Sequence, residues 1–477
     1  MSQIRVRFAP SPTGYLHIGG LRTALYDYLF ARSLGGKCIL RIEDTDQSRL
    51  VEGAVENLIK SLEQLDLHFD EGPSIGGDYG PYIQSQRLEL YHQEAQRLLH
   101  SGHAYHCFCT PETLAEMRQQ QQEAKQFVKY DRRCLALSEE QVQAKLAAGE
   151  PHVLRLKMPD DHEFVVEDII RGTVQIDASQ SDDQVLVKSD GFPTYHLAAV
   201  VDDHYMQISH VIRGEEWLSS TPKHIWLYQC LGWEVPQWVH LPLILNQDRS
   251  KLSKRMNDVS VESYLQKGYL KEALINFIAL LGWHPADDRE FYTLEELCQI
   301  FSLDRVSKAG AVFDLTKLDW MNGSYLKELP LETIVERSLP YFESAGLKVP
   351  EKDKFHRMVE VARQRSNLLA EIPEYCRMFL ETPNLQDKDL QNIQKEDAKQ
   401  VLSWFATNLP AHFPLDDGKV DSLVKEALAA TGLKAKAFYT PLRLAMLGQA
   451  HGPDLPSTFA ILGDSEALAR IQAALKL

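Results

Sequence analysis

The stretch Ala9-Pro-Ser-Pro-Thr-Gly-Tyr-Leu-His17-Ile-Gly-Gly20 decides how the first part of this chain folds. Residues 4–8, which precede it, alternate apolar and charged side chains and predict a short strand. Pro10 and Pro12 fix two backbone φ angles and exclude a helix at these positions. The strand must therefore lead into a turn rather than continue into a helix.

A helix pattern follows the loop. Leu21, Leu25 and Tyr28 recur at helical spacing, and the pair Gly35-Gly36 ends the pattern. Residues 37–42 then predict a second strand. This is a strand–loop–helix–strand unit with polar groups at the ends of its strands, where open parallel sheets bind ligands.

The loop itself has the chemistry of a phosphate site. Gly19 and Gly20 let the backbone approach a ligand closely, and a helix N-terminus offers free N–H groups and the positive end of a dipole. An N–H of the His17 imidazole could donate to a phosphoryl or ribose oxygen. The alternative is an ordinary strand–helix turn that contains proline and glycine.

A second stretch, Lys251-Leu-Ser-Lys254-Arg255, favours the phosphate site over the ordinary turn. Two ammonium groups three residues apart on a loop can hold a triphosphate, although such a run alone is usually a solvated basic turn. Paired with the His17 loop, it resembles the second signature of the class I aminoacyl-tRNA synthetases. Gly20 departs from the first signature, which has a second histidine at this position, and so one potential phosphate donor is lost.

Further stretches narrow the resemblance to the glutamyl/glutaminyl branch, and within it to the bacterial-type glutamyl-tRNA synthetases. They are Arg7-Phe-Ala-Pro-Ser-Pro-Thr-Gly14, Arg41-Ile-Glu-Asp-Thr-Asp46, Gly80-Pro-Tyr82, Pro193-Thr-Tyr-His196 and Val211-Ile-Arg-Gly214. The resemblance extends over nearly the whole chain. It implies an ATP-dependent attachment of L-glutamate to tRNA through glutamyl-adenylate, with Mg²⁺ accompanying the ATP.

The same resemblance implies an α/β fold with a Rossmann-type catalytic domain, an α+β insertion and an all-α C-terminal half. Helix-spaced residues and several prolines after residue 330, with no strand pattern, agree with the last part. The expected domains are the two catalytic halves 1–100 and 191–250, an insertion for the tRNA acceptor end at 101–190, a signature loop and helical connecting domain at 251–328, and a helical anticodon-binding domain at 329–477.

A pocket for free glutamate needs cations for its carboxylates and an anion for its ammonium group. Arg7, Glu43 and Arg213 each lie at or near the end of a predicted strand, and a guanidinium can bond both oxygens of a carboxylate. The resemblance assigns the carboxylates to the two arginines and adds Ser11 and Tyr195 to the pocket. Structural ion pairs are the alternative.

The ATP site implied by the resemblance contains one histidine, two glycines, one glutamate and two lysines. They are His17, Gly19, Gly20, Glu216, Lys251 and Lys254. Among them His17, Lys251 and Lys254 are the expected catalytic residues, because attack on an α-phosphate needs charge stabilisation and in-line placement more than a general base. No side chain is assigned as a nucleophile.

A structural zinc site is expected in the insertion. Cys107, Cys109 and Cys134 lie within 28 positions, and relatives in the resembling family hold Zn²⁺ through Cys-x-Cys and Tyr-x₃-Cys, which points to Tyr130 as a fourth ligand. On a strand, Cys107 and Cys109 would face the same side. His103 or His106 could replace Tyr130, and reduced, buried cysteines are the alternative to a metal site.

Anticodon reading is assigned to two arginines of the C-terminal half. Arg363 and Arg365 precede Pro373 in a helical context, where discriminating members of the family carry an arginine that screens the third anticodon base. A solvated basic helix face is the alternative. A non-discriminating enzyme that also charges glutamine-type tRNA stays open.

Composition limits the remaining possibilities. The net charge of −16 argues weakly against nucleic acid, since local basic patches suffice for structured RNA. Seven cysteines and no signal-like N-terminus favour a reducing, cytoplasmic location, and no apolar run reaches the roughly 18 residues of a membrane span. A monomer is expected. A tRNA-modifying glutamyl transferase and an inactive or regulatory tRNA-binding paralogue are the alternatives to the synthetase.

Overall fold

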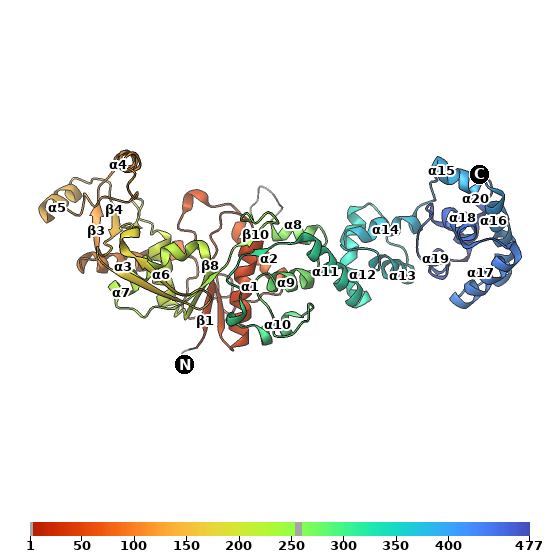
Figure 1. The fold of residues 1–477 in the computed structure, drawn as a ribbon, viewed down its shortest axis with the longest axis horizontal. Helices are drawn as coiled ribbons and strands as arrows, with labels where there is room; N and C mark the ends of the chain where they lie inside the picture. Colours follow the sequence, from red (N-terminus) through yellow and green to blue (C-terminus); the bar gives the residue numbers. More distant parts are fainter. Residues whose placement is uncertain (1–2, 253–259) are drawn as a thin grey trace. The chain divides into compact units, whose positions relative to one another are not determined.

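The computed structural model describes residues 3–252 and 260–477 of the chain (Figure 1). It divides into two compact units, of which the first contains Met1–Tyr264 and Leu274–Asp314 and the second Leu265–Ala273 and Leu315–Leu477. The predicted ATP ligand Lys254 lies outside the described residues.

The unit predicted around the His17 loop is present in the first of these two parts. β1 (Arg5–Phe8) pairs in parallel with β2 (Lys37–Leu40), and α1 (Ile18–Ser33) connects them. β8 (His210–Gly214) lies beside β1, where the Ser209 amide donates to the Arg5 carbonyl at 2.9 Å, and β9 (Gln237–Leu241) pairs in parallel with β8. The predicted α/β class is confirmed.

The segment predicted as an insertion contributes to two sheets. Its own antiparallel sheet has the order β3 (Ala104–Cys107), β4 (Val153–Leu156) and β7 (Val185–Val187), beside the helices α4 (Pro111–Glu123) and α5 (Glu139–Ala147). The hairpin β5 (Glu163–Asp168) and β6 (Gly172–Asp177) instead joins β9, where Asp168 pairs with Trp238, and forms a four-stranded sheet of order β6, β5, β9 and β8. Part of residues 101–190 thus shares a sheet with β8 and β9.

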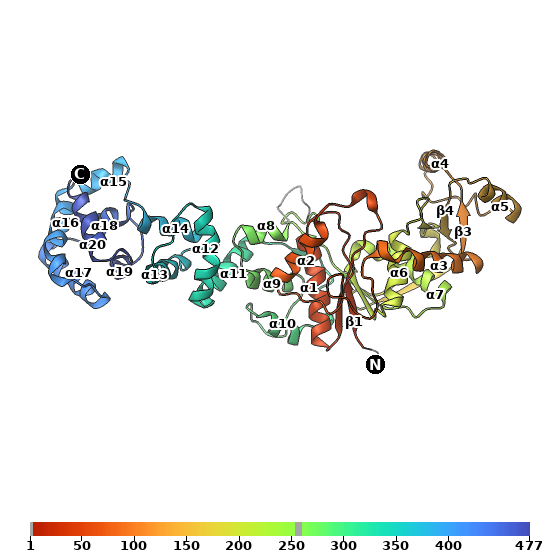
Figure 2. The same ribbon diagram turned by 180° about the vertical axis from the view of Figure 1, so that it is seen from behind.

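Helices cover the sheet and bury its apolar side chains. α3 (Leu88–His100), α6 (Tyr195–Tyr205) and α7 (Thr221–Leu231) pack around a core that includes Tyr91, Phe164 and Val211. Residues 195–201 form the first turns of α6. α1 packs against α10 (Leu294–Ile300), which both ribbon views show side by side (Figures 1 and 2).

The remaining elements of the first unit are short. They are α2 (Ala54–Gln64), α8 (Val261–Gln266), α9 (Lys271–Ala279) and the parallel pair of β10 (Ile244–Leu245) with β11 (Ala311–Val312). β11 is a short strand inside residues 251–328, which were expected to contain a signature loop and a helical connecting domain. α8 and α9 extend into the second unit.

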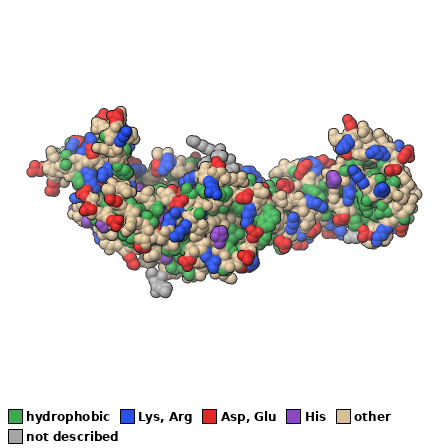
Figure 3. Space-filling view, in the orientation of Figure 1, with side chains coloured by type: hydrophobic (Ala, Val, Ile, Leu, Met, Phe, Trp, Pro, Cys, Tyr) green, Lys and Arg blue, Asp and Glu red, His purple; other side chains and the backbone are tan. Residues whose placement is uncertain are grey.

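The second unit contains helices and no β-strand within its described residues. Its helices are α11 (Leu315–Glu328), α12 (Leu331–Ser344), α13 (Lys352–Arg363), α14 (Glu371–Leu380), α15 (Asp387–Ile393), α16 (Glu396–Asn408), α17 (Asp417–Thr431), α18 (Ala435–Leu447), α19 (Leu455–Leu462) and α20 (Asp464–Ala474). They share one apolar core that contains Phe342, Phe405 and Phe459. Positive and negative side chains are interspersed on the face of the molecule seen in Figure 3.

Within the described residues, no helix combines the length and apolarity that a membrane span requires.

Candidate active site

A cleft of about 890 Å³ opens at the carboxyl ends of β1, β2 and β8. Ten of the residues predicted for glutamate or ATP binding line it. They are Arg7, Ser11, His17, Gly19, Gly20, Glu43, Tyr195, Arg213, Glu216 and Lys251. Residues from five separate stretches of sequence therefore meet in one place, as expected for strand ends of a parallel sheet.

The His17 side chain forms the N-cap of α1. Its Nδ1 accepts a hydrogen bond from the Gly20 amide at 3.0 Å, so a neutral imidazole carries its proton on Nε2. A Cβ at position 19 would lie 3.2 Å from Cε1 and Nδ1 of the ring, which is tight, and glycine therefore suits this position. The capping bond thus assigns the proton of a neutral ring to Nε2, and His17 lines the cleft.

Arg7, one of the two arginines predicted for the glutamate pocket, lies among buried ion pairs. Arg7 Nε donates to Asp203 Oδ1 at 2.9 Å, and Arg41 Nη1 donates to the same oxygen at 2.7 Å. Arg41 also donates to Glu43 Oε1 at 2.9 Å. Burial alone would raise the pKa of Asp203, but the two guanidinium groups outweigh it and hold that pKa below its usual range. The charges of Arg7 and Glu43 are thus already compensated by protein groups.

Arg213 differs from Arg7 because all its acceptors are neutral. Its N–H groups donate to His240 Nε2 (3.0 Å), the Tyr195 hydroxyl (3.1 Å), His224 Nδ1 (3.1 Å), Thr221 Oγ1 (2.9 Å) and, more weakly, the Trp217 carbonyl (3.4 Å). The residue is only 6% exposed, and no described carboxylate pairs with it. A buried guanidinium without an anionic partner at the wall of a cleft favours an anionic ligand.

The outer end of the cleft carries more exposed charges. Lys251 Nζ lies 3.4 Å from Glu216 Oε1, and the two side chains are 58% and 44% exposed. An ion pair this exposed contributes little to stability, so an incoming phosphate group can compete for the lysine at small cost.

Sequence reasoning missed the partners of the predicted residues. Asp203 lies on α6, and His240 lies on β9 with Asp168 of β5 behind it at 2.7 Å. Asp203 stands between Asp202 and His204, and His240 is a single histidine in an apolar strand. No local pattern separates either of them from a structural residue. Only the hydrogen bonds that they form with site arginines identify them.

Residues 3–320 match the family described as tRNA synthetases class I (E and Q), catalytic domain. This chain belongs to that family. Residues 333–475 also match an anticodon binding domain, so the two matches together cover most of this chain.

The chain is also similar to curated relatives and solved structures over its whole length. The glutamate–tRNA ligase of Alkaliphilus metalliredigens is 47% identical, with 99% of each chain covered, and that of Clostridioides difficile is 44% identical, with 98% of each covered. The glutamate tRNA ligase from Elizabethkingia meningosepticum, solved in complex with its amino acid, superposes with a TM-score of 0.93 at 36% identity and covers 100% of this chain and 99% of its own.

Three cysteine sulfurs of this synthetase converge in the insertion. The Sγ atoms of Cys107, Cys109 and Cys134 lie within 4.8 Å of one another, and the Tyr130 hydroxyl lies 3.3 Å from Cys107 Sγ and 3.5 Å from Cys109 Sγ. Hydrogen bonding with Cys134, and to a smaller extent with Tyr130, lowers the pKa of the Cys107 thiol and so favours the thiolate. The set fits a tetrahedral zinc ion.

The structure differs from the predicted zinc site in two details. β3 ends at Cys107, so strand alternation does not bring Cys109 to the same side; the loop after the strand does. The histidines proposed as substitutes for Tyr130 do not join the cluster. His103 Nδ1 bonds Ser101 Oγ at 2.9 Å, and the His106 ring lies against those of Phe108 and His152.

The two arginines predicted for the anticodon lie in different surroundings. Arg363 Nη1 donates to the Leu329 carbonyl at 2.7 Å and Nη2 lies 2.6 Å from Glu360, with only 11% of the side chain exposed. Arg365 is exposed and lines a hollow of about 1010 Å³ in the helical unit, together with Tyr375 and Arg443. Arg365 is therefore the accessible member of the pair.

Proposed function

We propose that this protein attaches L-glutamate to tRNA in two steps. In the first, a glutamate carboxylate oxygen attacks the α-phosphorus of ATP, and diphosphate leaves to give glutamyl-adenylate. In the second, a ribose hydroxyl at the 3′ end of tRNA attacks the acyl carbon, and AMP leaves. The observation that carries the proposal is Arg213, a buried cation with neutral acceptors at the wall of a cleft that also contains the His17 loop.

The residues of the cleft divide the activation step between them. Arg213 takes the side-chain carboxylate of glutamate, Arg7 and Ser11 hold its other end, and Glu43 and Tyr195 face its ammonium group. The phosphates of ATP, with their Mg²⁺, lie over the N-terminus of α1, where His17 and the Gly19 amide offer N–H groups and Gly20 lets the phosphates approach the backbone closely. Lys251 and Lys254, with Glu216 beside them, complete the nucleotide end. Placement and charge, rather than a protein nucleophile, accelerate the attack.

The test of this function is ATP–diphosphate exchange that depends on glutamate, measured with and without tRNA, followed by transfer of labelled glutamate to tRNA. We expect glutamate-dependent exchange and an acylated tRNA. A protein that binds tRNA but catalyses neither step would be the inactive or regulatory paralogue. The tRNA-modifying transferases lack a helical C-terminal half, which this chain has. Because charged tRNA is consumed in translation, a cytoplasmic location accompanies the proposal; the monomeric state stays a prediction.

We also propose a structural zinc ion on Cys107, Cys109, Cys134 and Tyr130. Zinc thiolate bonds would connect the end of β3 to the segment around Cys134. No ligand position is left open for water, and so the ion would stabilise the insertion rather than take part in chemistry.

Metal analysis of protein purified without chelator is expected to give about one zinc per chain. Cys109→Ser should lose the metal and lower the melting temperature of the insertion, because one thiolate ligand is removed. Cys230→Ser, a half-buried cysteine outside the cluster, is the matched control and should keep the zinc. Fully active, zinc-free protein with three titratable thiols in the insertion would contradict the site.

Arg365→Gln is expected to let the enzyme charge glutamine-type tRNA with glutamate, because it removes a charge that would screen the third anticodon base. Arg363→Gln is the control for this variant: its guanidinium is turned inward, so it should change stability more than tRNA selection. The measurement is the ratio of kcat/KM for the two tRNAs. An unchanged ratio in Arg365→Gln would remove this residue from anticodon reading.

A further inference from the structure

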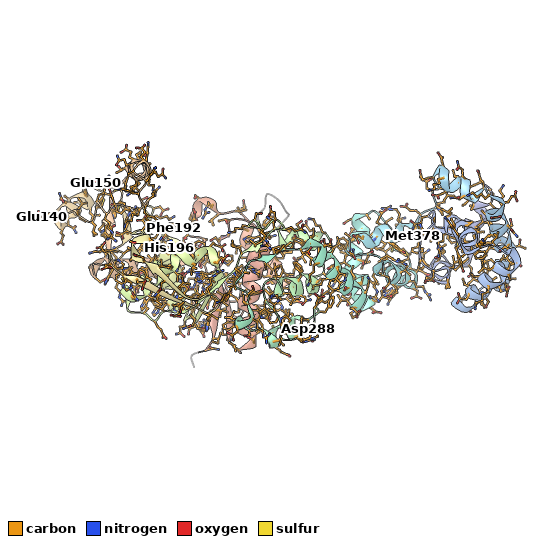
Figure 4. The ribbon with its side chains drawn as sticks, in the orientation of Figure 1. Glu140, Glu150, Phe192, His196, Asp288 and Met378 are labelled. Carbon is orange, nitrogen blue, oxygen red and sulfur yellow. The ribbon has the colours of Figure 1, made fainter. Side chains whose placement is uncertain are left out.

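Two histidines that the proposed reaction does not use hold Arg213 in place. Arg213 Nε donates to His240 Nε2 at 3.0 Å, and Nη1 donates to His224 Nδ1 at 3.1 Å. The Nδ1 atom of His240 lies 2.7 Å from Asp168 Oδ2, on the side of the ring away from Arg213. The Nε2 atom of His224 lies 3.0 Å from Nδ1 of His196. His196, which Figure 4 labels, is the second residue of α6. A hydrogen-bonded chain therefore passes through the arginine.

The guanidinium and the carboxylate determine the direction of every hydrogen bond in this series from Asp168 to His196. A guanidinium can only donate, and an ionised carboxylate can only accept. His240 must therefore carry its proton on Nδ1, toward Asp168, and accept at Nε2. His224 must accept at Nδ1 and carry its proton on Nε2, toward His196. A proton added to either acceptor nitrogen would place two donors face to face.

The Asp168 end of the chain is firmly built. Besides the His240 ring, this carboxylate accepts hydrogen bonds from the amides of His240 (3.0 Å), Ile170 (3.0 Å) and Arg171 (2.7 Å). Burial would raise the pKa of Asp168, but the bond from His240 and the bond from the Arg171 amide outweigh it and keep that pKa below its usual range. The group stays ionised and can fix the tautomer of His240.

Both imidazoles that accept from Arg213 are kept neutral by their surroundings. Burial lowers the pKa of His240, and Arg213 and Arg171 lower it further, against the opposite effect of Asp168. Burial lowers the pKa of His224 well below its usual value, and the nearby cationic groups add to this. The arginine thus meets acceptors without charge, whereas Arg7 and Arg41 meet the carboxylate of Asp203.

We propose that His240, oriented by Asp168, and His224 are positioning residues for Arg213, and that their neutral acceptors orient its guanidinium without compensating its charge. A side-chain carboxylate then supplies the missing negative charge, and a carboxamide of the same shape does not. The two histidines would in this way set the preference for glutamate over glutamine. The inference rests on the proposed function.

A crossed pair of substitutions tests it at each histidine. Gln places its amide oxygen near the Nε2 position of an imidazole, and Asn places it near Nδ1. His240→Gln therefore keeps an acceptor for Arg213, and His240→Asn keeps only the contact with Asp168. At position 224 the order is reversed, since His224→Asn keeps the acceptor and His224→Gln does not. Loss of the ring is common to both members of a pair, and so their difference reports the bond to Arg213.

We expect His240→Asn and His224→Gln to raise KM for glutamate about tenfold or more, with kcat and KM for ATP changed less than about threefold. His240→Gln and His224→Asn should stay within about threefold of the wild type in all three constants. Equal effects of Gln and Asn at either position, or a parallel rise in KM for ATP, would overturn the positioning role.

His240→Glu tests the part of the inference that concerns charge. It matches His240→Gln in shape but places a carboxylate against Arg213. The ratio of kcat/KM for glutamate to that for glutamine should fall about tenfold below that of His240→Gln; an unchanged ratio would refute the charge argument. A wild-type protein without glutamate-dependent exchange would defeat the proposed function itself, whereas an active wild type with uniform variants would defeat only this inference.

Discussion

Arg213→Ala is expected to lower kcat/KM for glutamate about 1000-fold, the largest loss for any single change outside the nucleotide end of the cleft. The variant removes a buried positive charge from the cleft wall, and a carboxylate bound there would have no cation of its own. Arg7 cannot replace it, because Asp203 already compensates its charge. Losing one member of a buried, hydrogen-bonded charge pair costs about 2–5 kcal/mol, which spans the expected loss.

The measurement is ATP–diphosphate exchange at varied glutamate, with KM for ATP as the internal reference. Arg213→Lys should recover only part of the loss, because an ammonium group keeps the charge but cannot span the fork of acceptors that a guanidinium reaches. Arg32→Ala, which removes a half-exposed arginine paired with Asp70, should leave kcat/KM for glutamate within about threefold of the wild type. If Arg213→Ala uses glutamate as well as this control does, the glutamate pocket lies elsewhere.

The residues that could be predicted from the sequence lie next to strong local signals. Pro10, Pro12 and the paired glycines mark the loop at the end of β1, and Arg213 is the next-to-last residue of the short strand β8. Because side chains at the carboxyl ends of parallel strands meet at one edge, assigning the strands was enough to expect Arg7, Glu43 and Arg213 close together. The roles of these ligands came from the resemblance, not from the pattern.

The groups that set the electrostatics of the cleft could not be predicted in this way. Asp203 meets Arg7 across 196 positions of sequence, and Asp168 meets His240 across 72. These contacts depend on how β5, β8 and β9 are paired and on which face of α6 turns inward. Periodicity within one segment contains neither kind of information.

Side-chain direction was also beyond the sequence argument. Arg363 and Arg365 are two positions apart, and their charge and helical context gave no reason to separate them. The structure separates them because Arg363, the last residue of α13, turns toward the Leu329 carbonyl, whereas Arg365 follows the helix end. The same limit applies to Cys109, which lies beyond the strand that was expected to orient it.

The second large effect is expected at His17, where two roles can be separated. The ring caps α1 through Nδ1 and offers an N–H from Nε2. His17→Asn keeps an acceptor near the Nδ1 position, and asparagine is among the best N-cap residues, so the free energy of unfolding should change by less than about 0.5 kcal/mol. His17→Ala loses the cap and should be less stable by about 1 kcal/mol.

Both variants are nevertheless expected to lower kcat of ATP–diphosphate exchange about 100-fold or more, because neither has a donor at the Nε2 position to stabilise charge on the phosphates as diphosphate leaves. KM for glutamate should change little, since the histidine lies at the nucleotide end of the cleft. Urea unfolding and exchange kinetics, measured on the same samples, separate the two roles. If His17→Asn retained the activity of the wild type while His17→Ala lost it, the histidine would serve the helix end alone, and the phosphate donors of the loop would be its backbone amides.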